Sequence, residues 1–153
     1  MAEIVTLTPS PAVDLSTSVA RLDPDHKLRC AAPRRDPGGG GINVARVIHR
    51  LGGKVTAVYP AGGPSGDLLT RLLREEGVPT HPVRASGDTR ENFYVLETST
   101  GRQFKFILPG PVLGPKEEAA PDSGGTGIPL LNVLKRGGDW REVLPQQTSG
   151  QEQ

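Results

Sequence analysis

Four consecutive glycines, Gly38 to Gly41, stand directly before a helical pattern, and they constrain the fold more than any other stretch. Glycine has no Cβ, so its backbone can adopt positive φ and approach a neighbouring group or a ligand closely. The free N–H groups and the positive dipole end of the following helix favour an anionic or hydroxyl-rich ligand. The run therefore predicts either a binding turn or a tight strand-to-helix connection.

The glycine run does not match the two common nucleotide-binding fingerprints. No Gly-Lys-Ser/Thr follows it, which excludes the lysine-bearing phosphate loop. The preceding residues 30–36 are polar and basic, whereas the dinucleotide fingerprint follows a buried strand.

A longer pattern surrounds the run: two small residues, a Gly, x-Asn-x-Ala, six residues, a Gly, nine more and a Gly. In this chain the pattern is formed by Gly38, Gly39, Gly41, Asn43, Ala45, Gly52 and Gly62. It resembles the first signature of the PfkB-type sugar kinases, in the ribokinase-like superfamily. Residues 6–14 are similar to the family's first strand, and residues 27–33, 59–63 and 89–92 resemble its 6-phosphofructokinase branch.

The resemblance runs from about Ile4 to Pro111 and implies an α/β fold. We expect a partial doubly wound sheet with a small β-sheet lid, truncated relative to the family. Residues 1–111 would be the N-terminal part of the kinase domain. Residues 112–153 form an unmatched tail rich in Gly and Pro, which we expect to be disordered.

Hydrophobic periodicity supports this fold class. Strands are predicted at 4–8, 54–59 and 80–84, and helices at 43–51 and 67–76. The first strand, helix and second strand form a unit that favours a right-handed crossover. In the first helix we expect an apolar stripe formed by Val44, Val47, Ile48 and Leu51.

Residues 92–97 and 102–108 alternate with period two around Ser99-Thr100-Gly101 and predict a β-hairpin. In the resemblance this hairpin joins strands from residues 14–36 to form the lid, and such lids commonly form a dimer interface. We expect Leu28 and Cys30 to point inward from short strands, and a homodimer to form through the lid.

The resemblance also implies a sugar-phosphate site. Asp14 is expected in a loop just past the first strand, at the edge where open α/β sheets bind ligands; without the resemblance it would pass for a solvated loop residue. Arg suits a phosphate because its planar fork matches the oxygens. The implied residues are Asp14, Gly39, Gly40 and Asn43 for the sugar, Arg90 with Asn92 for the 6-phosphate, and Lys27 for a phosphate or nucleotide.

The family's reaction needs ATP, Mg²⁺ and a catalytic base. Its Gly-Ala-Gly-Asp and Asn-x-x-Glu motifs, which supply the base and serve the metal, do not occur in this sequence. We therefore expect the chain alone not to phosphorylate a sugar. A frameshift, a truncated gene and a fragment are each compatible with this boundary.

Gly40 occupies a position where 1-phosphofructokinases tend to carry Lys, so fructose 6-phosphate is the favoured substrate. One alternative is a sister kinase acting on tagatose 6-phosphate or fructose 1-phosphate. Another is a non-catalytic module that binds a sugar phosphate or a partner.

Charge and composition narrow the remaining classes. A net charge of +1 gives no electrostatic reason to expect nucleic acid or membrane binding. No apolar stretch is long enough to span a bilayer, and the three histidines lack metal-ligand spacing. The single cysteine, Cys30, suits a reducing compartment, so a cytoplasmic protein is expected.

Overall fold

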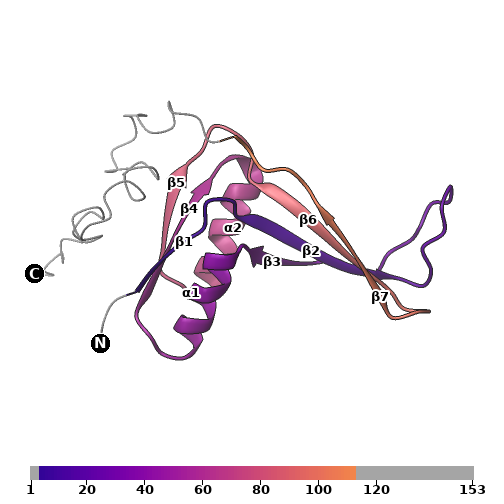
Figure 1. The fold of residues 1–153 in the computed structure, drawn as a ribbon, viewed down its shortest axis with the longest axis horizontal. Helices are drawn as coiled ribbons and strands as arrows, with labels where there is room; N and C mark the ends of the chain where they lie inside the picture. The colour runs from indigo at the N-terminus through magenta and orange to yellow at the C-terminus, as the bar shows by residue number, and fades with distance from the viewer. Residues whose placement is uncertain (1–3, 113–153) are drawn as a thin grey trace, which may run out of the picture.

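The computed structural model describes residues 4–112, which form two β-sheets and two α-helices (Figure 1). A parallel sheet has the strand order β1-β4-β5, and the four-stranded sheet, called the lid below, has the order β3-β2-β6-β7. The strands of the parallel sheet are β1 (Ile4–Leu7), β4 (Val55–Ala61) and β5 (Thr80–Arg84). The strands of the lid are β2 (Ala12–Val19), β3 (Arg34–Gly38), β6 (Arg90–Glu97) and β7 (Arg102–Ile107). The helices are α1 (Gly40–Arg50) and α2 (Gly63–Glu75).

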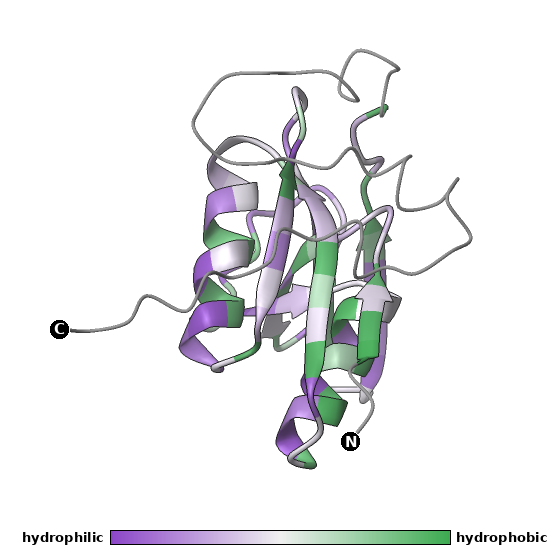
Figure 2. Ribbon diagram, turned by 90° about the vertical axis from the view of Figure 1, so that its left-hand side faces the viewer, coloured by the Kyte–Doolittle hydropathy of each residue, from purple (hydrophilic) through white to green (hydrophobic). Residues whose placement is uncertain are grey.

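The core lies between the parallel sheet and the two helices. Alternate residues of β4, namely Val55, Ala57 and Tyr59, are buried and belong to one cluster with residues from both helices. The helical members are Ile42 and Ala45 from α1, and Leu69 and Leu73 from α2. In Figure 2 hydrophobic residues concentrate on the strands, whereas the helices mix hydrophobic and hydrophilic positions. The predicted strand–helix–strand unit and the apolar stripe of the second helix are confirmed.

Helix α1 differs from the prediction in its start and its buried face. It begins at Gly40, three residues before the predicted Asn43, and it buries Ile42 and Ala45. Val44, Val47 and Leu51 are 51%, 53% and 81% exposed, so that part of the predicted stripe was wrong; only Ile48 packs against the core. The side of α1 that packs against the core carries Ile42, Ala45 and Ile48. Ile42 was missed because it lies before the predicted start of the helix.

The lid extends away from the helices as a twisted arm (Figure 1). Its hairpin and its assembly with strands from residues 14–36 are confirmed. The predicted loop position of Asp14 was wrong, because Pro9 and Pro11 end β1 and the chain then begins β2 at Ala12. Strands at Leu28 and Cys30 were also wrong: residues 20–33 contain no strand, and Cys30 is exposed.

The two faces of the lid have different chemistry, because successive residues of a strand point to opposite faces. The pairing register places polar side chains together on one face: Asp14, Ser16, Asn92, Tyr94 and Lys105. The opposite face, called the apolar lid face below, carries Leu15, Phe93, Val95, Phe104 and Phe106, together with Thr17, Glu91 and Glu97 nearer its ends and edges.

Gly41 fixes the close contact between α1 and β1. A Cβ at this position would lie 2.5 Å from the Leu7 carbonyl oxygen and 2.6 Å from Thr8 Oγ1. The first atom belongs to the backbone of β1, so a side chain could be admitted only by moving the helix. At Gly40 a Cβ would meet nothing within 4 Å.

None of the helices within residues 4–112 is long and apolar enough to cross a membrane. The predicted tail, from Leu113 onward, lies outside the described residues.

The two glycines generate a matched prediction. Gly41→Ala should lower the free energy of unfolding by about 3 kcal/mol, since the new methyl group overlaps backbone atoms of β1. Gly40→Ala should leave stability unchanged or raise it by up to about 1 kcal/mol, because alanine favours a helix over glycine. Urea unfolding of the parent and both variants measures this. Equal stability of the two variants would contradict the close contact.

Candidate functional site

The site begins with a pair of side chains on adjacent lid strands. Asp14 on β2 and Asn92 on β6 are register partners, and Asn92 Nδ2 donates a hydrogen bond of 2.9 Å to Asp14 Oδ1. Asn92 is 5% exposed, and its Oδ1 is buried without a hydrogen-bond partner in the structure. The bond holds the Asp14 carboxylate in place.

Gly38 lies directly against the same carboxylate. Its strand partner is Ala12, and a Cβ at Gly38 would lie 2.5 Å from Asp14 Oδ2. The first glycine of the run therefore leaves room for the aspartate.

A cavity of about 380 Å³ opens beside this pair at the base of the lid. Asp14 comes from β2 and Asn43 from the first turn of α1, so the cavity brings together two of the residues predicted to bind sugar. Its full lining is Asp14, Ser16, Arg34, Asp36, Pro37, Asn43, Arg46 and Tyr94.

Arg90 lies two residues before Asn92 on β6, on the same face of the lid. Its guanidinium donates from Nη2 to the Ser10 carbonyl at 3.2 Å and from Nη1 to the Leu108 carbonyl at 3.4 Å. These bonds hold the cation where the chain leaves β1 and where it leaves β7. Its Nε is buried without a partner in the structure.

The start of α1 supplies backbone donors. Gly39 is the N-cap with φ of 122°, and no side chain caps the helix. The first N–H groups of a helix have no partner within it, and they favour negative charge. Gly40 is exposed at this end, with open space where a Cβ would stand.

The sequence model of the pfkB family carbohydrate kinases matches residues 6–119. The chain belongs to the pfkB family.

Relatives within this family carry consistent names. The chain is 53% identical over 115 residues to ATP-dependent 6-phosphofructokinase isozyme 2 of Mycobacterium tuberculosis, which covers 75% of the chain and 34% of the relative. It is 47% identical over 117 residues to the Escherichia coli enzyme of the same name, covering 76% of the chain and 38% of the relative.

The fold matches as well. The crystal structure of E. coli phosphofructokinase-2 in complex with fructose-6-phosphate superposes with a TM-score of 0.73 and 47% identity, covering 76% of this chain and 39% of that one. The chain therefore has the N-terminal part of the pfkB fold and spans between a third and two-fifths of the length of these relatives.

Lys27 is not brought to the other predicted residues within one copy of the chain. It is exposed in the segment between β2 and β3, which forms the far tip of the lid in Figure 1. The remaining predicted residues, Asp14, Gly39, Gly40, Asn43, Arg90 and Asn92, all belong to the base of the lid or the start of α1.

The sequence interpretation missed Tyr94 and Lys105. Tyr94 lines the cavity, and partial burial together with the nearby Asp14 carboxylate raises the pKa of its phenol. Lys105 Nζ lies 5.8 Å from the centre of the Tyr94 ring, within cation–π range. Strand alternation could have found Tyr94, because it stands two residues after Asn92; it was missed because Asp14 was assigned to a loop.

Arg46 and Glu76 form a double hydrogen-bonded ion pair at the edge of the cavity. Arg46 donates from Nη2 to Glu76 Oε1 at 2.6 Å and from Nε to Oε2 at 2.8 Å. The guanidinium holds the pKa of Glu76 below its usual value of 4.5, and the carboxylate raises the pKa of Arg46. The negative charges of Asp36 and Asp14 also raise the pKa of Arg46, by smaller amounts.

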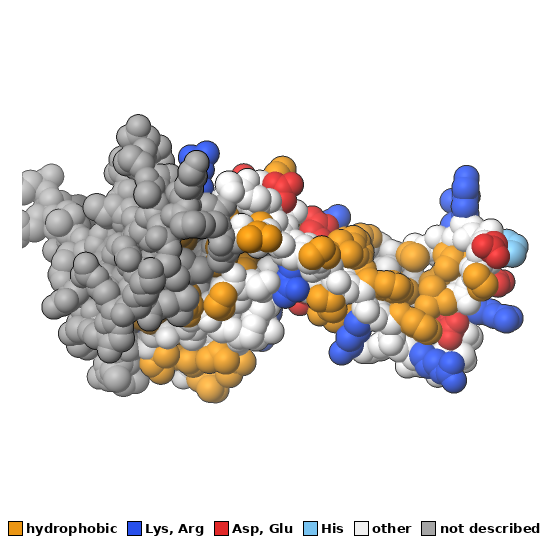
Figure 3. Space-filling view, turned by 45° about the horizontal axis from the view of Figure 1, so that its top comes forward, with side chains coloured by type: hydrophobic (Ala, Val, Ile, Leu, Met, Phe, Trp, Pro, Cys, Tyr) orange, Lys and Arg blue, Asp and Glu red, His pale blue; other side chains and the backbone are white. Residues whose placement is uncertain are grey.

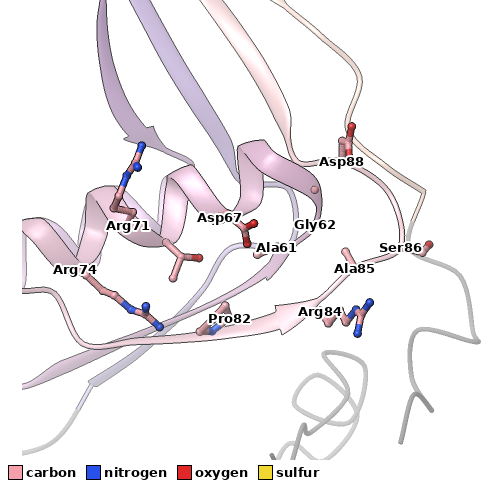
Figure 4. A pocket seen from close by; sticks show the side chains of 12 residues that line it. Ala61, Gly62, Asp67, Arg71, Arg74, Pro82, Arg84, Ala85, Ser86 and Asp88 are labelled. Carbon is pink, nitrogen blue, oxygen red and sulfur yellow. The ribbon is translucent and has the colours of Figure 1, made fainter. Parts of the chain in front are cut away.

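A larger cavity, about 800 Å³, lies between α2 and β5 (Figure 4). Its lining mixes three arginines, Arg71, Arg74 and Arg84, with Asp67 and Asp88. In Figure 4 the arginine side chains point in different directions and do not converge on one place. None of the residues predicted to bind the sugar phosphate lines this cavity.

The ion pair of Glu76 generates a pH prediction. Its folded pKa is lowered, so its stabilisation is present at neutral pH and is lost as the pH falls through that pKa. Glu76→Gln should therefore cost about 1–3 kcal/mol of unfolding free energy at pH 7 and progressively less at an acidic pH, as the carboxylate becomes protonated.

Glu75→Gln is the matched control, because Glu75 is 63% exposed and lies 4.0 Å from its partner Arg71. It should change stability little at either pH. Urea unfolding at both pH values measures this, and a pH-independent cost for Glu76→Gln would show that the charge is unimportant.

Proposed function

We propose that the lid base and the start of α1 form the sugar-phosphate half of a 6-phosphofructokinase site, with fructose 6-phosphate as the ligand. The observation that carries this is the hydrogen-bonded pair of Asp14 and Asn92, which shares the polar lid face with Arg90 and a cavity with Asn43. Across the whole protein, the reaction would move the γ-phosphoryl group of ATP to the 1-hydroxyl of the sugar.

Each residue has a role that its chemistry permits. The Asp14 carboxylate only accepts hydrogen bonds when ionised, so it suits sugar hydroxyls and repels phosphate. Asn43 offers a neutral amide from the other side of the same cavity. Arg90 carries the positive charge and the planar fork that match a phosphate group.

ATP and Mg²⁺ are part of this proposal through the family's reaction. Among residues 4–112, no group of three or more His, Cys, Asp or Glu could hold a metal ion. The described residues therefore do not supply a magnesium site, and we assign no step of phosphoryl transfer to them. Lys27 at the lid tip is proposed to approach a phosphate or nucleotide of a second copy of the chain.

A homodimer through the lid is also proposed. The apolar lid face carries three phenylalanines, and Phe106 is 49% exposed. Hydrophobic side chains gather along the projecting arm in Figure 3. A second lid is a suitable cover, because the same apolar strands would face each other in a two-fold interface. We propose a cytoplasmic location, since a reducing compartment suits the exposed thiol of Cys30.

Two substitutions separate sugar recognition from phosphate recognition. Arg90→Ala should weaken binding of fructose 6-phosphate by about ten- to a hundredfold, because it removes a charge-assisted contact. Asp14→Ala should weaken the binding of fructose 6-phosphate but leave the binding of inorganic phosphate almost unchanged. Isothermal titration calorimetry with both ligands measures this.

Arg84→Ala is the matched control, since Arg84 is exposed and lines the other cavity. It should bind both ligands as the parent does. If Arg90→Ala binds fructose 6-phosphate with the parent's affinity, the proposed phosphate contact is wrong.

A further inference from the structure

One guanidinium, that of Arg46, connects the three elements that meet at the cavity. Besides its two bonds to Glu76 after α2, Arg46 Nη1 donates to the Pro37 carbonyl of β3 at 3.1 Å and to Asn43 Oδ1 of α1 at 3.4 Å. Its side chain is 15% exposed. A side chain with four bonds has little freedom to leave this position.

The bond to Asn43 determines which way that amide faces. Arginine has only donors, so the atom of Asn43 that faces Arg46 must be the oxygen. The Nδ2 group, with its two hydrogens, is then left to donate toward a ligand in the cavity. Without the bond to Arg46, the Asn43 amide could rotate by half a turn and present its oxygen, an acceptor, to the cavity in place of the NH₂ donor.

The bond to Pro37 acts on the lid. Pro37 lies near the end of β3, and the chain passes from there through Gly38 and Gly39 into α1. Arg46 therefore ties the base of the lid to the helix that follows it. The paired carboxylates of Asp14 and Asp36 on β2 and β3 repel each other. The ion pair of Arg34 with Asp36, at 2.7 Å, and the nearby charge of Arg46 offset this repulsion.

We propose that Arg46, held by Glu76, is a positioning residue of the sugar-phosphate site. It fixes the amide of Asn43 as a hydrogen-bond donor and fixes the base of the lid that carries Asp14. This inference rests on the proposed function for its ligand, but the orientation of Asn43 can be measured without one.

Arg50 provides a matched control on the same helix. It also donates to Glu76, from Nη2 to Oε2 at 3.3 Å, but its side chain is 64% exposed. None of its hydrogen bonds within the described residues reaches Asn43 or Pro37. Arg50→Lys thus disturbs the same carboxylate and leaves the proposed contacts in place.

The test compares Arg46→Lys, Glu76→Gln and Arg50→Lys in the full chain. Calorimetry should show fructose 6-phosphate binding about tenfold weaker in Arg46→Lys and weaker in Glu76→Gln, but within twofold of the parent in Arg50→Lys. In an Asn43→Ala background, Arg46→Lys should lose the part of its effect that acts through Asn43 and keep only the part that acts through the Pro37 carbonyl. An undiminished effect there, or equal losses for Arg46→Lys and Arg50→Lys, would overturn the proposal.

A ligand-free measurement separates this inference from the proposed function. The side-chain NH₂ signals of Asn43 in a ¹H–¹⁵N spectrum, assigned by their loss in Asn43→Asp, should shift in Arg46→Lys and Glu76→Gln and stay in place in Arg50→Lys. Unchanged signals in Arg46→Lys would overturn the positioning role. If the variants show these shifts but the parent chain binds no fructose 6-phosphate, the positioning role stands and the proposed ligand is refuted.

Discussion

The contact between Gly41 and the end of β1 is the constraint on which the rest of the structure depends. At this point the first turn of α1 lies against the Leu7 carbonyl, with no room for a Cβ. The contact seats the helix on the parallel sheet and brings Asn43 next to the lid. Because β2 starts five residues after Leu7, the same contact sets where Asp14 lies relative to the helix.

The glycine run thus has two uses that were alternatives at the level of the sequence. Gly38 and Gly41 are required by close neighbours, the Asp14 carboxylate and the backbone of β1. Gly40 faces open space at the positive end of a helix. A tight connection and a binding turn are therefore compatible in one stretch of chain.

The elements with strong hydrophobic periodicity could be predicted from the sequence. The buried face of α1 and the start of β2 could not, because they depend on local features that the periodicity does not show. The parallel strands and the lid hairpin have clear apolar patterns, and they were found within two residues of their observed bounds. Helix α2 was also found, although it begins at Gly63, four residues before the predicted Asp67. The buried face of α1 includes Ile42, which lies before the predicted start of the helix, and the small Ala45, so the pattern of the other large residues pointed to the wrong side. Asp14 was misplaced because the two prolines before it resemble a loop, although a strand begins directly after Pro11.

Much of the candidate site could be predicted because its residues stand in a recognisable family motif. Arg46 could not, since its position depends on a contact with Glu76, 30 residues away. The described residues contain groups that suit recognition of a sugar phosphate, and they lack a cluster of metal ligands.

The most direct test of the central claim is a titration of uniformly ¹⁵N-labelled chain with fructose 6-phosphate, followed by backbone ¹H–¹⁵N shifts. The account predicts saturable shifts confined to the glycine run, the first turn of α1 and the neighbouring residues of β2 and β6. Shifts centred on the cavity between α2 and β5, or no shifts at millimolar ligand, would contradict it.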